Sequence, residues 1–422
     1  MSQNIVPNWS GIEKTIFRVS FCYLIFYFIF LSNVFIRFPF VGYIHKPFQY
    51  ISDGFISFVN RLFIHNKYDE NIYTGLGDTS WFVIACLSYL ILAIVTTAVW
   101  TILDKRKTYL ILFTYLQTYA RYYLAFILLT YGLDKLFGNQ FPEPSGNLIR
   151  PLGNIGPHTL LWTFMGASES YNFFAGLVET IAGVLLLFRR TTALGALIAL
   201  GSLTNVLIID IAFDTLVKML VAHLILISFF IVSPDVKRLL SFFISKPNIS
   251  LAALPFIAVN KRFRPIQYAL KFMLIVYVVF TLVKFNMEFA NKYLKPYLGG
   301  IDGIYEIKEF SLNQQSLPPL TTDTLRWKKF AIHRIGYATI QFMNDSSFEC
   351  SVQGDSIAKS LTLTYWNDST FKSKLYYTIS SPDEFVFEGN YKYDSIRFTS
   401  NKIDPKDLPL LKDKGKIKWL WW

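Results

Sequence analysis

The sequence predicts an α-helical membrane protein, with a bundle of about seven transmembrane spans followed by a small C-terminal antiparallel β domain. Three observations lead to this fold class. Of the 422 residues, 53% are apolar and 18% are aromatic, which is more than a soluble core can hide. Long apolar stretches recur with roughly the 20 residues that a helix needs to cross the hydrocarbon. After residue 290 these runs give way to alternating apolar and polar residues.

The expected spans differ in how cleanly they stand out. The second one, WFVIACLSYLILAIVTTAVW, carries no charge, whereas the fourth, fifth and sixth are shorter or charged. The first span starts too late and is too long for a cleaved signal peptide, so we expect a retained anchor. The spans cover residues 16–37, 80–103, 109–131, 171–188, 191–211, 215–232 and 267–288.

The formal net charge of +12 is concentrated at the ends of these spans. With seven spans, all the basic clusters fall on one side of the membrane, which is the positive-inside pattern. This pattern places the N-terminus in the cytoplasm and the C-terminal segment outside, and it disfavours nucleic acid as the partner of the positive charge. The clusters are DKRK (104–107), Arg189-Arg190, DVKRLL (235–240) and NKRFRP (260–265).

Cysteine and histidine supply no redox or metal motif. The three cysteines, Cys22, Cys86 and Cys350, form no C-x-x-C pair and no disulfide framework. The five histidines are scattered without metal-ligand spacing, so we expect no metal site. His223 lies inside the sixth span, where we expect a hydrogen-bonded core histidine.

Four regions follow from the composition. Thr-, Tyr- and Phe-rich alternation in the last region predicts strands at 337–343, 361–366, 374–380, 384–389 and 393–399, arranged as a meander or partial barrel. The regions are 1–108 with two spans and an outside loop, 109–232 with a four-helix core, 233–289 with a basic cytoplasmic loop and the seventh span, and 290–422 with the β domain.

Short segments within these regions have their own expectations. FISFVNRLF (55–63) predicts an amphipathic helix and HTLLWTFM (158–165) a surface or re-entrant helix. The short FDT loop at 213–215 predicts that the fifth and sixth spans form an antiparallel hairpin. The C-terminal KIKWLWW (416–422) suits either an interface anchor or a last strand of the β domain.

Polar residues at membrane depth are the candidate functional residues, because burying charge in hydrocarbon is costly. Arg121 and Glu179 lie near the middle of their spans and would form a buried pair. Asn205 would join the same interior, while Lys135, Asp214 and Lys218 lie at outer helix ends, where Asp214 and Lys218 would meet. Two interpretations remain open: a packing device within the bundle, or a polar cavity that opens outward.

The block 109–232 resembles the DoxX family of small membrane proteins. The resemblance rests on ARYYLAFILLTYGLDKLFGNQFP, FAGLVETIAGVLLLFRRTTALGALI and NVLIIDIAFDTLVKML, which match an Arg-bearing first helix, a Gly-rich second helix with Glu, and polar last helices. It implies a four-helix transmembrane core in a bacterial inner membrane with a periplasmic tail. A more distant similarity is to the vitamin K-dependent carboxylase and related membrane proteins, which implies a bundle combined with a β-rich region outside.

The DoxX resemblance implies a subunit of a membrane oxidoreductase that binds a quinone or similar lipid. On this hypothesis Arg121 and Glu179 bind or relay protons, and Asn205 and Lys218 orient the head group. Lys135 and Asp214 are further candidates for binding the cofactor. One alternative is a non-enzymatic transport or envelope-assembly component whose residues 290–422 bind a partner protein. A third is a carboxylase-like enzyme with Lys218 as its base. The catalytic candidates are therefore Arg121, Glu179 and Lys218.

Overall fold

The structure of the chain is a computed structural model that describes residues 9–31, 39–65, 77–245, 261–291, 300–333, 336–365 and 368–411. The chain divides into two compact units. Unit 1 comprises Met1–Thr130 and Val178–Thr281, and unit 2 comprises Tyr131–Leu177 and Leu282–Trp422. The region boundaries expected at 108, 232 and 289 mark changes in composition along the sequence. The two units instead group residues that lie close together in space, so their boundaries differ. The C-terminal KIKWLWW segment lies outside the described residues.

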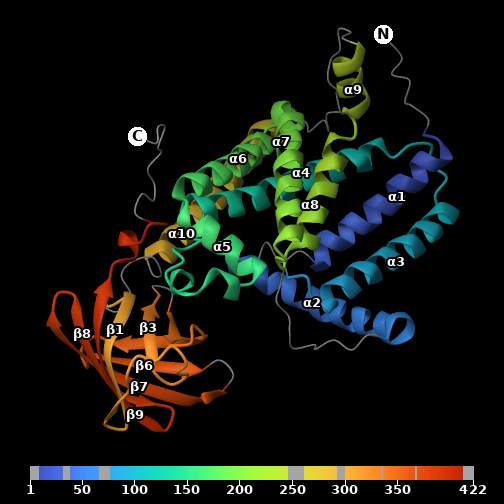
Figure 1. Cartoon of the computed structure of the whole chain (residues 1–422). Helices are drawn as coiled ribbons and strands as arrows, with labels where there is room; N and C mark the ends of the chain where they lie inside the picture. Colours follow the sequence, from blue (N-terminus) through green and yellow to red (C-terminus); the bar gives the residue numbers. More distant parts are fainter. Residues whose placement is uncertain are drawn as a thin grey trace. The chain divides into compact units, whose positions relative to one another are not determined.

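Unit 1 is built from helices (Figure 1). Short π-helical turns, Tyr27–Leu31 and Asn60–Ile64, extend two of them. The helices that lie wholly or partly in unit 1 are α1 (Gly11–Phe26), α2 (Pro39–Val59), α3 (Ser80–Leu103), α4 (Leu110–Leu136), α6 (Glu169–Leu187), α7 (Thr192–Ala212), α8 (Lys218–Val232), α9 (Val236–Ser245) and α10 (Arg264–Phe289). The expected amphipathic helix at 55–63 is the end of the longer α2 and its π-helical turn.

Several of these helices are long and apolar enough to cross a membrane. Among the described residues they are Gly11–Leu31, Ser80–Leu103, Glu169–Leu187, Arg189–Ala212 and Arg264–Phe289. A sixth candidate is α8 with α9, which bend by 76° at the break between them. A membrane protein is thus supported, but the expected seven spans are not confirmed. The expected third span is the helix α4, whose Gln117, Arg121 and tyrosines make it less apolar than the others.

Two helix pairs organise unit 1. The first pair, α1 and α3, packs side by side, and the guanidinium of the buried Arg18 fastens it. Arg18 donates to the hydroxyl of Thr101 at 2.8 Å, the carbonyl of Asp104 at 3.1 Å and the hydroxyl of Tyr109. The second pair, α7 and α8, is joined by a short turn after Ala212 and packs together, which confirms the expected hairpin.

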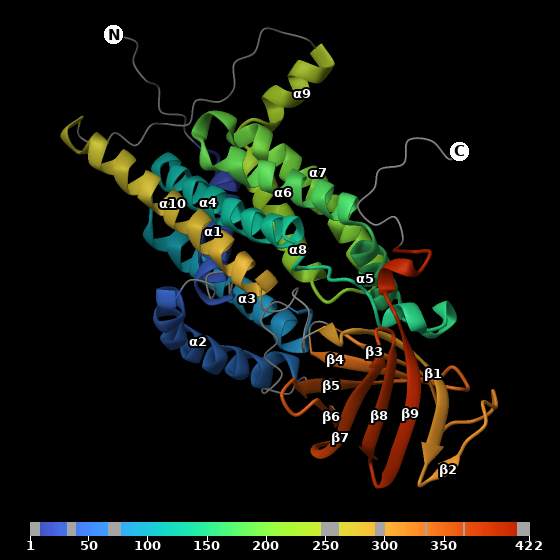
Figure 2. The same ribbon diagram turned by 90° about the vertical axis from the view of Figure 1, so that its left-hand side faces the viewer.

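Unit 2 contains an antiparallel β-barrel. Its strand order is β2-β1-β3-β4-β5-β6-β7-β8-β9, and pairing between β1 and β9 closes eight strands into a barrel, with β2 as a short addition to β1. The strands are β1 (Gly303–Leu312), β2 (Gln315–Ser316), β3 (Trp327–Ile332), β4 (Tyr337–Phe342), β5 (Ser347–Asp355), β6 (Ser360–Tyr365), β7 (Asp368–Ser381), β8 (Glu384–Tyr391) and β9 (Asp394–Ile403). Figure 2 shows the strands wrapping into this barrel.

Aromatic side chains fill the barrel. Trp327, Phe330 and Phe387 are fully buried and pack with Phe310 and Phe398. Because side chains occupy the interior, the barrel is a packed core rather than a ligand cup. This closed barrel replaces the expected meander or partial barrel.

The five strands expected from alternation correspond to β4, β6, β7, β8 and β9. The expectation missed β1, β3 and β5, as well as the two-residue β2. Bulges explain two of these omissions, because the register shifts between Ile307 and Glu309 in β1 and between Trp327 and Lys329 in β3. Each extra residue breaks the period-two pattern on which the prediction depended. The third strand, β5 (SFECSVQGD), is mostly polar.

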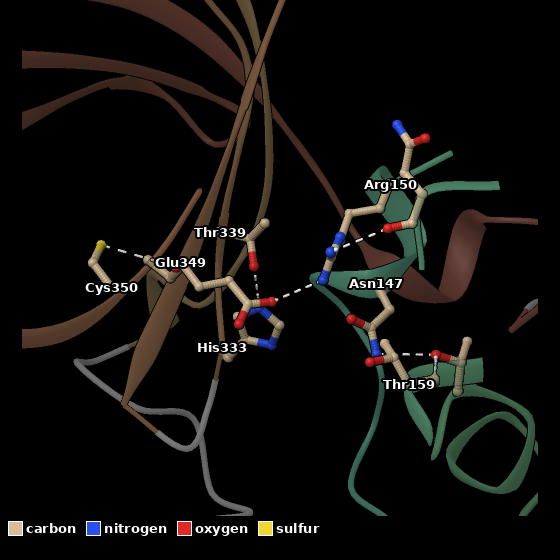
Figure 3. Close-up of polar contacts among 10 residues, drawn as sticks. Asn147, Arg150, Thr159, His333, Thr339, Glu349 and Cys350 are labelled. Carbon is tan, nitrogen blue, oxygen red and sulfur yellow. Dashed lines mark hydrogen bonds and ion pairs between the residues drawn. The ribbon is translucent and has the colours of Figure 1, made fainter. Parts of the chain in front are cut away.

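A loop segment of unit 2 packs against one rim of the barrel. Around α5 (Pro157–Ala167), which confirms the expected helix at 158–165, lie the short helices Asn147–Ile149 and Leu152–Asn154. Ile149 packs with Ile304 and Ala331 of the barrel. Arg150 donates to Glu349 of β5 at 3.1 Å (Figure 3).

Candidate functional site

Among the described helices of unit 1, a cluster of polar side chains surrounds His223. The hydroxyl of Tyr23 lies 2.7 Å from Nε2 of His223. Nδ1 of the same ring lies 2.6 Å from the carbonyl oxygen of Met219, one turn earlier on α8. A carbonyl only accepts, so Nδ1 carries the proton, Nε2 accepts, and Tyr23 donates. In the neutral imidazole, this arrangement turns the basic Nε2 toward the phenol of Tyr23.

Aromatic rings hold this imidazole in place. Tyr27 stacks on His223 with the ring centroids 4.5 Å apart and the planes 2° from parallel. Phe82 of α3 meets the imidazole edge to face at 6.3 Å. Both flanking rings are buried, with 1% of each side chain exposed, and His223 itself is 6% exposed. The cluster therefore brings α1 with its π-helical extension, α3 and α8 together around one ring.

A thiol completes the cluster. The Sγ atom of Cys86 lies 3.9 Å from Nε2 of His223, within reach of a weak sulfur hydrogen bond. All three cysteines are free thiols, and Cys86 is buried. The cluster thus combines a phenol, an imidazole and a thiol, all neutral, in an apolar setting. These groups can pass a proton among themselves without burying a net charge.

The interior site expected from the sequence does not form as predicted. The Arg121 side chain is the first example. It is only 9% exposed. Its Nη1 donates to the hydroxyl of Thr192 at 3.2 Å, and its guanidinium lies 4.8 Å from the centroid of the Tyr122 ring. The side chain of Arg121, on α4, therefore contacts the start of α7 and not the middle of α6.

The register of α4 against α6 separates Arg121 from Glu179. A Cβ placed on Gly183 would lie 2.9 Å from Leu129 and 3.0 Å from the carbonyl of Ala125, so these residues face each other. Towards the start of α4 the partner becomes Thr192 beyond the end of α6, whereas Glu179 lies one turn before Gly183, in the opposite direction. At 1.5 Å per residue, Arg121 and Glu179 are roughly 15 Å apart along the helices. The expected Arg121–Glu179 pair is wrong.

The remaining cofactor candidates do not gather in one place either. Asn205 lies on an exposed face of α7, so its expected place in a shared interior is wrong. Glu179, with 5% exposed, and Lys135, with 8%, are buried. The Nζ atom of Lys135 lies 5.8 Å from the centroid of the Tyr131 ring within unit 2. Ligand binding by these residues stays a prediction.

Asp214 and Lys218 meet at the turn into α8, as expected. Nζ of Lys218 lies 2.8 Å from Oδ1 of Asp214 and donates to the carbonyl of Thr215 at 2.6 Å. Asp78, which sequence reasoning missed, accepts from the backbone N–H groups of Lys218 and Met219 at 2.8 and 2.9 Å. The carboxylate of Asp78 therefore caps the start of α8, and the Lys218 ammonium belongs to this helix start.

Comparison with known proteins places the chain in a family. Over 127 residues it is 35% identical to the uncharacterized protein YwoB of Bacillus subtilis (strain 168). The matched stretch is 30% of this chain and 81% of YwoB. The chain belongs to the YwoB family. Because YwoB is described as uncharacterized, membership of its family assigns no activity.

The other comparisons add no relative. No protein-family model matches the chain. No solved structure matches it. In the part of the chain that the structure describes, no group of three or more His, Cys, Asp or Glu side chains could hold a metal ion.

Sequence reasoning missed most of the His223 cluster in this YwoB-family chain because it searched for charge. Tyr23, Tyr27 and Cys86 are neutral and stand within apolar runs, where nothing marks them as polar partners. The available signal was spacing. Tyr23 and Tyr27 are four residues apart, as are Phe82 and Cys86, so each pair shares one helix face. Which helix those faces meet depends on tertiary packing.

Proposed function

We propose that the chain is an integral membrane subunit of an oxidoreductase that binds a quinone or a similar lipid-soluble ring beside Tyr23 and His223. The observation that carries the proposal is the 2.7 Å hydrogen bond from the Tyr23 hydroxyl to Nε2 of a buried, neutral His223. A quinone presents two carbonyl oxygens that accept hydrogen bonds, and a quinol presents two hydroxyls that donate them. A phenol beside an imidazole offers both complementary roles.

The chemistry assigned to the cluster is proton transfer. When a quinol loses two electrons it also releases two protons, and Nε2 of His223 can take a proton directly or through Tyr23. The electrons require a redox partner, which is why the proposal is for a subunit rather than a complete enzyme.

Two further considerations support this class. The DoxX resemblance of residues 109–232 implies redox complexes and quinone-facing sites. The candidate spans are compatible with a lipid bilayer, in which quinones dissolve. The proposal relocates the expected site from Arg121 and Glu179 to the His223 cluster. It keeps the expected orientation, with the N-terminus in the cytoplasm of a bacterial inner membrane and the β-barrel in the periplasm.

The proposal is tested by the quinone content of the purified full chain. The protein is saturated with a ubiquinone or menaquinone analogue in neutral detergent, re-purified and extracted with solvent, and the quinone is quantified against protein. We expect stoichiometric quinone in the wild type and loss of it in His223→Phe, which keeps an aromatic ring against Tyr27. Asn205→Ala, on an exposed face of α7, serves as the matched control. Equal quinone in wild type and His223→Phe, or none in either, contradicts the proposal.

A further inference from the structure

The corner between α6 and α7 is the second unusual polar region of unit 1. The first of these helices ends at Leu187, a 3-10 turn covers Arg189–Thr191, and α7 starts at Thr192. Both helices are candidate membrane spans. The turn between two consecutive spans lies at an edge of the bilayer, which is the depth of lipid phosphates.

Arg121 reaches this corner with hydrogen-bonding capacity to spare. Its Nη1 bonds Thr192, but its buried Nε has no hydrogen-bond partner among the described residues. A guanidinium carries five N–H donors. Arg18, another buried arginine among the described residues of unit 1, shows how such a group is normally satisfied, since its nitrogens bond two hydroxyls and a carbonyl. Arg121 is also buried, but its Nε atom has no such partner.

A second cation lies at the same corner. Nζ of Lys271, on α10, donates to the carbonyl of Leu187 at 2.9 Å and lies 5.8 Å from the centroid of the Tyr122 ring. That ring is the one over which Arg121 lies at 4.8 Å. No ion pair joins either cation to a carboxylate within the described ranges. Positive charge is therefore concentrated here without a countercharge from those residues, an arrangement that costs free energy.

The start of α7 adds N–H donors to this charge. Its N-cap residue, Thr191, makes no capping hydrogen bond to the first turn, because its hydroxyl donates back to the carbonyl of Leu185 at 2.6 Å. The hydroxyl of Thr192 also donates back, to Phe188 at 3.0 Å. The N–H groups of the first turn thus have no side-chain cap, and they carry the positive end of the helix dipole. Such a helix start binds phosphate readily.

We propose that Arg121, Lys271 and the first turn of α7 form a binding site for a phosphate group at the membrane edge. The guanidinium of Arg121 supplies charge-assisted hydrogen bonds, which suit phosphate oxygens. The ammonium of Lys271 neutralises the remaining charge, and the N–H groups after Thr191 complete the site. A lipid headgroup and free phosphate offer the same chemistry. The site is separate from the His223 cluster and does not rest on the quinone proposal.

The test uses the delipidated full chain in neutral detergent and follows its melting temperature. The probes are dioctanoyl phosphatidylglycerol, dioctanoyl phosphatidylcholine and inorganic phosphate. For wild type we expect stabilisation by phosphatidylglycerol, and for Arg121→Gln an apparent affinity lower by at least about tenfold, as for loss of a charge-assisted contact. Lys271→Gln should give a smaller loss. Stabilisation by inorganic phosphate alone would assign the site to the free ion, with the same dependence on Arg121.

A matched variant controls for the loss of one positive charge. Arg106→Gln removes an arginine that is mostly exposed beside Asp104 and should respond like wild type. Should Arg121→Gln fail to fold, Arg121→Lys keeps the charge but not the fork of donors, and native mass spectrometry then counts the phosphatidylglycerol retained per chain. The proposal is overturned if no probe stabilises the wild type, or if Arg121 variants retain the probe as well as Arg106→Gln.

Discussion

Buried polar side chains in this chain differ in how completely they are satisfied, and that difference assigns their roles. The guanidinium of Arg18 donates to Thr101, Asp104 and Tyr109, and its role is to stabilise helix packing. In His223, Nδ1 is held by the carbonyl of Met219, whereas Nε2 faces a phenol and a thiol, which can exchange protons. Arg121 retains an unbonded nitrogen. Charge alone, which guided the sequence interpretation, does not distinguish these three cases.

At the same scale, Gly146 is predicted to be irreplaceable beside His333. A Cβ added there would overlap Nε2 and Cε1 of His333 and lie 2.5 Å from the hydroxyl of Thr339. Figure 3 shows His333 and Thr339 joined at this rim. We expect Gly146→Ala to destabilise unit 2 by about 1–3 kcal/mol, the usual cost of overpacking. Gly153→Ala, where a Cβ meets nothing within 4 Å, is the control. Thermal melts of both variants check this, and identical melts would refute the contact.

His333 also predicts a pH dependence of the barrel. Burial lowers its pKa from 6.5 to about 3. Between these values the unfolded chain binds a proton that the folded barrel does not, so unfolding takes up a proton and stability falls as the pH falls. Each pH unit in this window removes up to ~1.4 kcal/mol. Hydrogen exchange of barrel peptides at pH 7 and pH 5 measures the loss, and His333→Gln should flatten it. An unchanged slope in that variant would show that other groups titrate.

At the scale of single elements, the sequence predicted which helices and strands form better than it predicted how neighbouring helices align along each other. The hairpin of α7 and α8, the helix α5 and five barrel strands follow from local pattern. The Arg121–Glu179 pair failed because depth was counted from the ends of apolar runs, whereas α4 starts at Leu110 and continues to Leu136. The contact of Gly183 with Ala125 and Leu129 sets how far α6 slides along it. No residue of α4 read alone reveals that offset.

The start of α8 gives a prediction at this scale. Asp78 accepts from the N–H groups of Lys218 and Met219, whereas the Asp214 side chain is 83% exposed and forms an ion pair with Lys218. We expect Asp78→Ala to lower stability by about 1 kcal/mol, as for loss of a helix cap. Asp214→Ala should cost less, since exposed ion pairs contribute little. Chemical denaturation of both variants compares them, and a larger loss in Asp214→Ala would contradict the capping role.

At the scale of the whole molecule, composition was enough to predict the two kinds of architecture. Apolar helices with exposed faces and an antiparallel β domain were both expected. Only 11% of the apolar stretch of α10 is buried, so this helix has such an exposed apolar face. The closed barrel was not predicted because β-bulges in β1 and β3 hide two strands. The His223 cluster was not predicted because it assembles from three stretches of sequence far apart in the chain. A protein partner for residues 290–422 stays a prediction.

The central claim is that a quinone-like ring binds at Tyr23 and His223. The most direct measurement is photo-crosslinking of the full chain with an azidoquinone, followed by peptide mass spectrometry. We predict label on the α1, α3 and α8 peptides that contain Tyr23, Cys86 and His223, with competition by unlabelled quinone and loss in His223→Phe. Label confined to the exposed faces of α7 and α10, unaffected by competitor or by that substitution, would contradict the account.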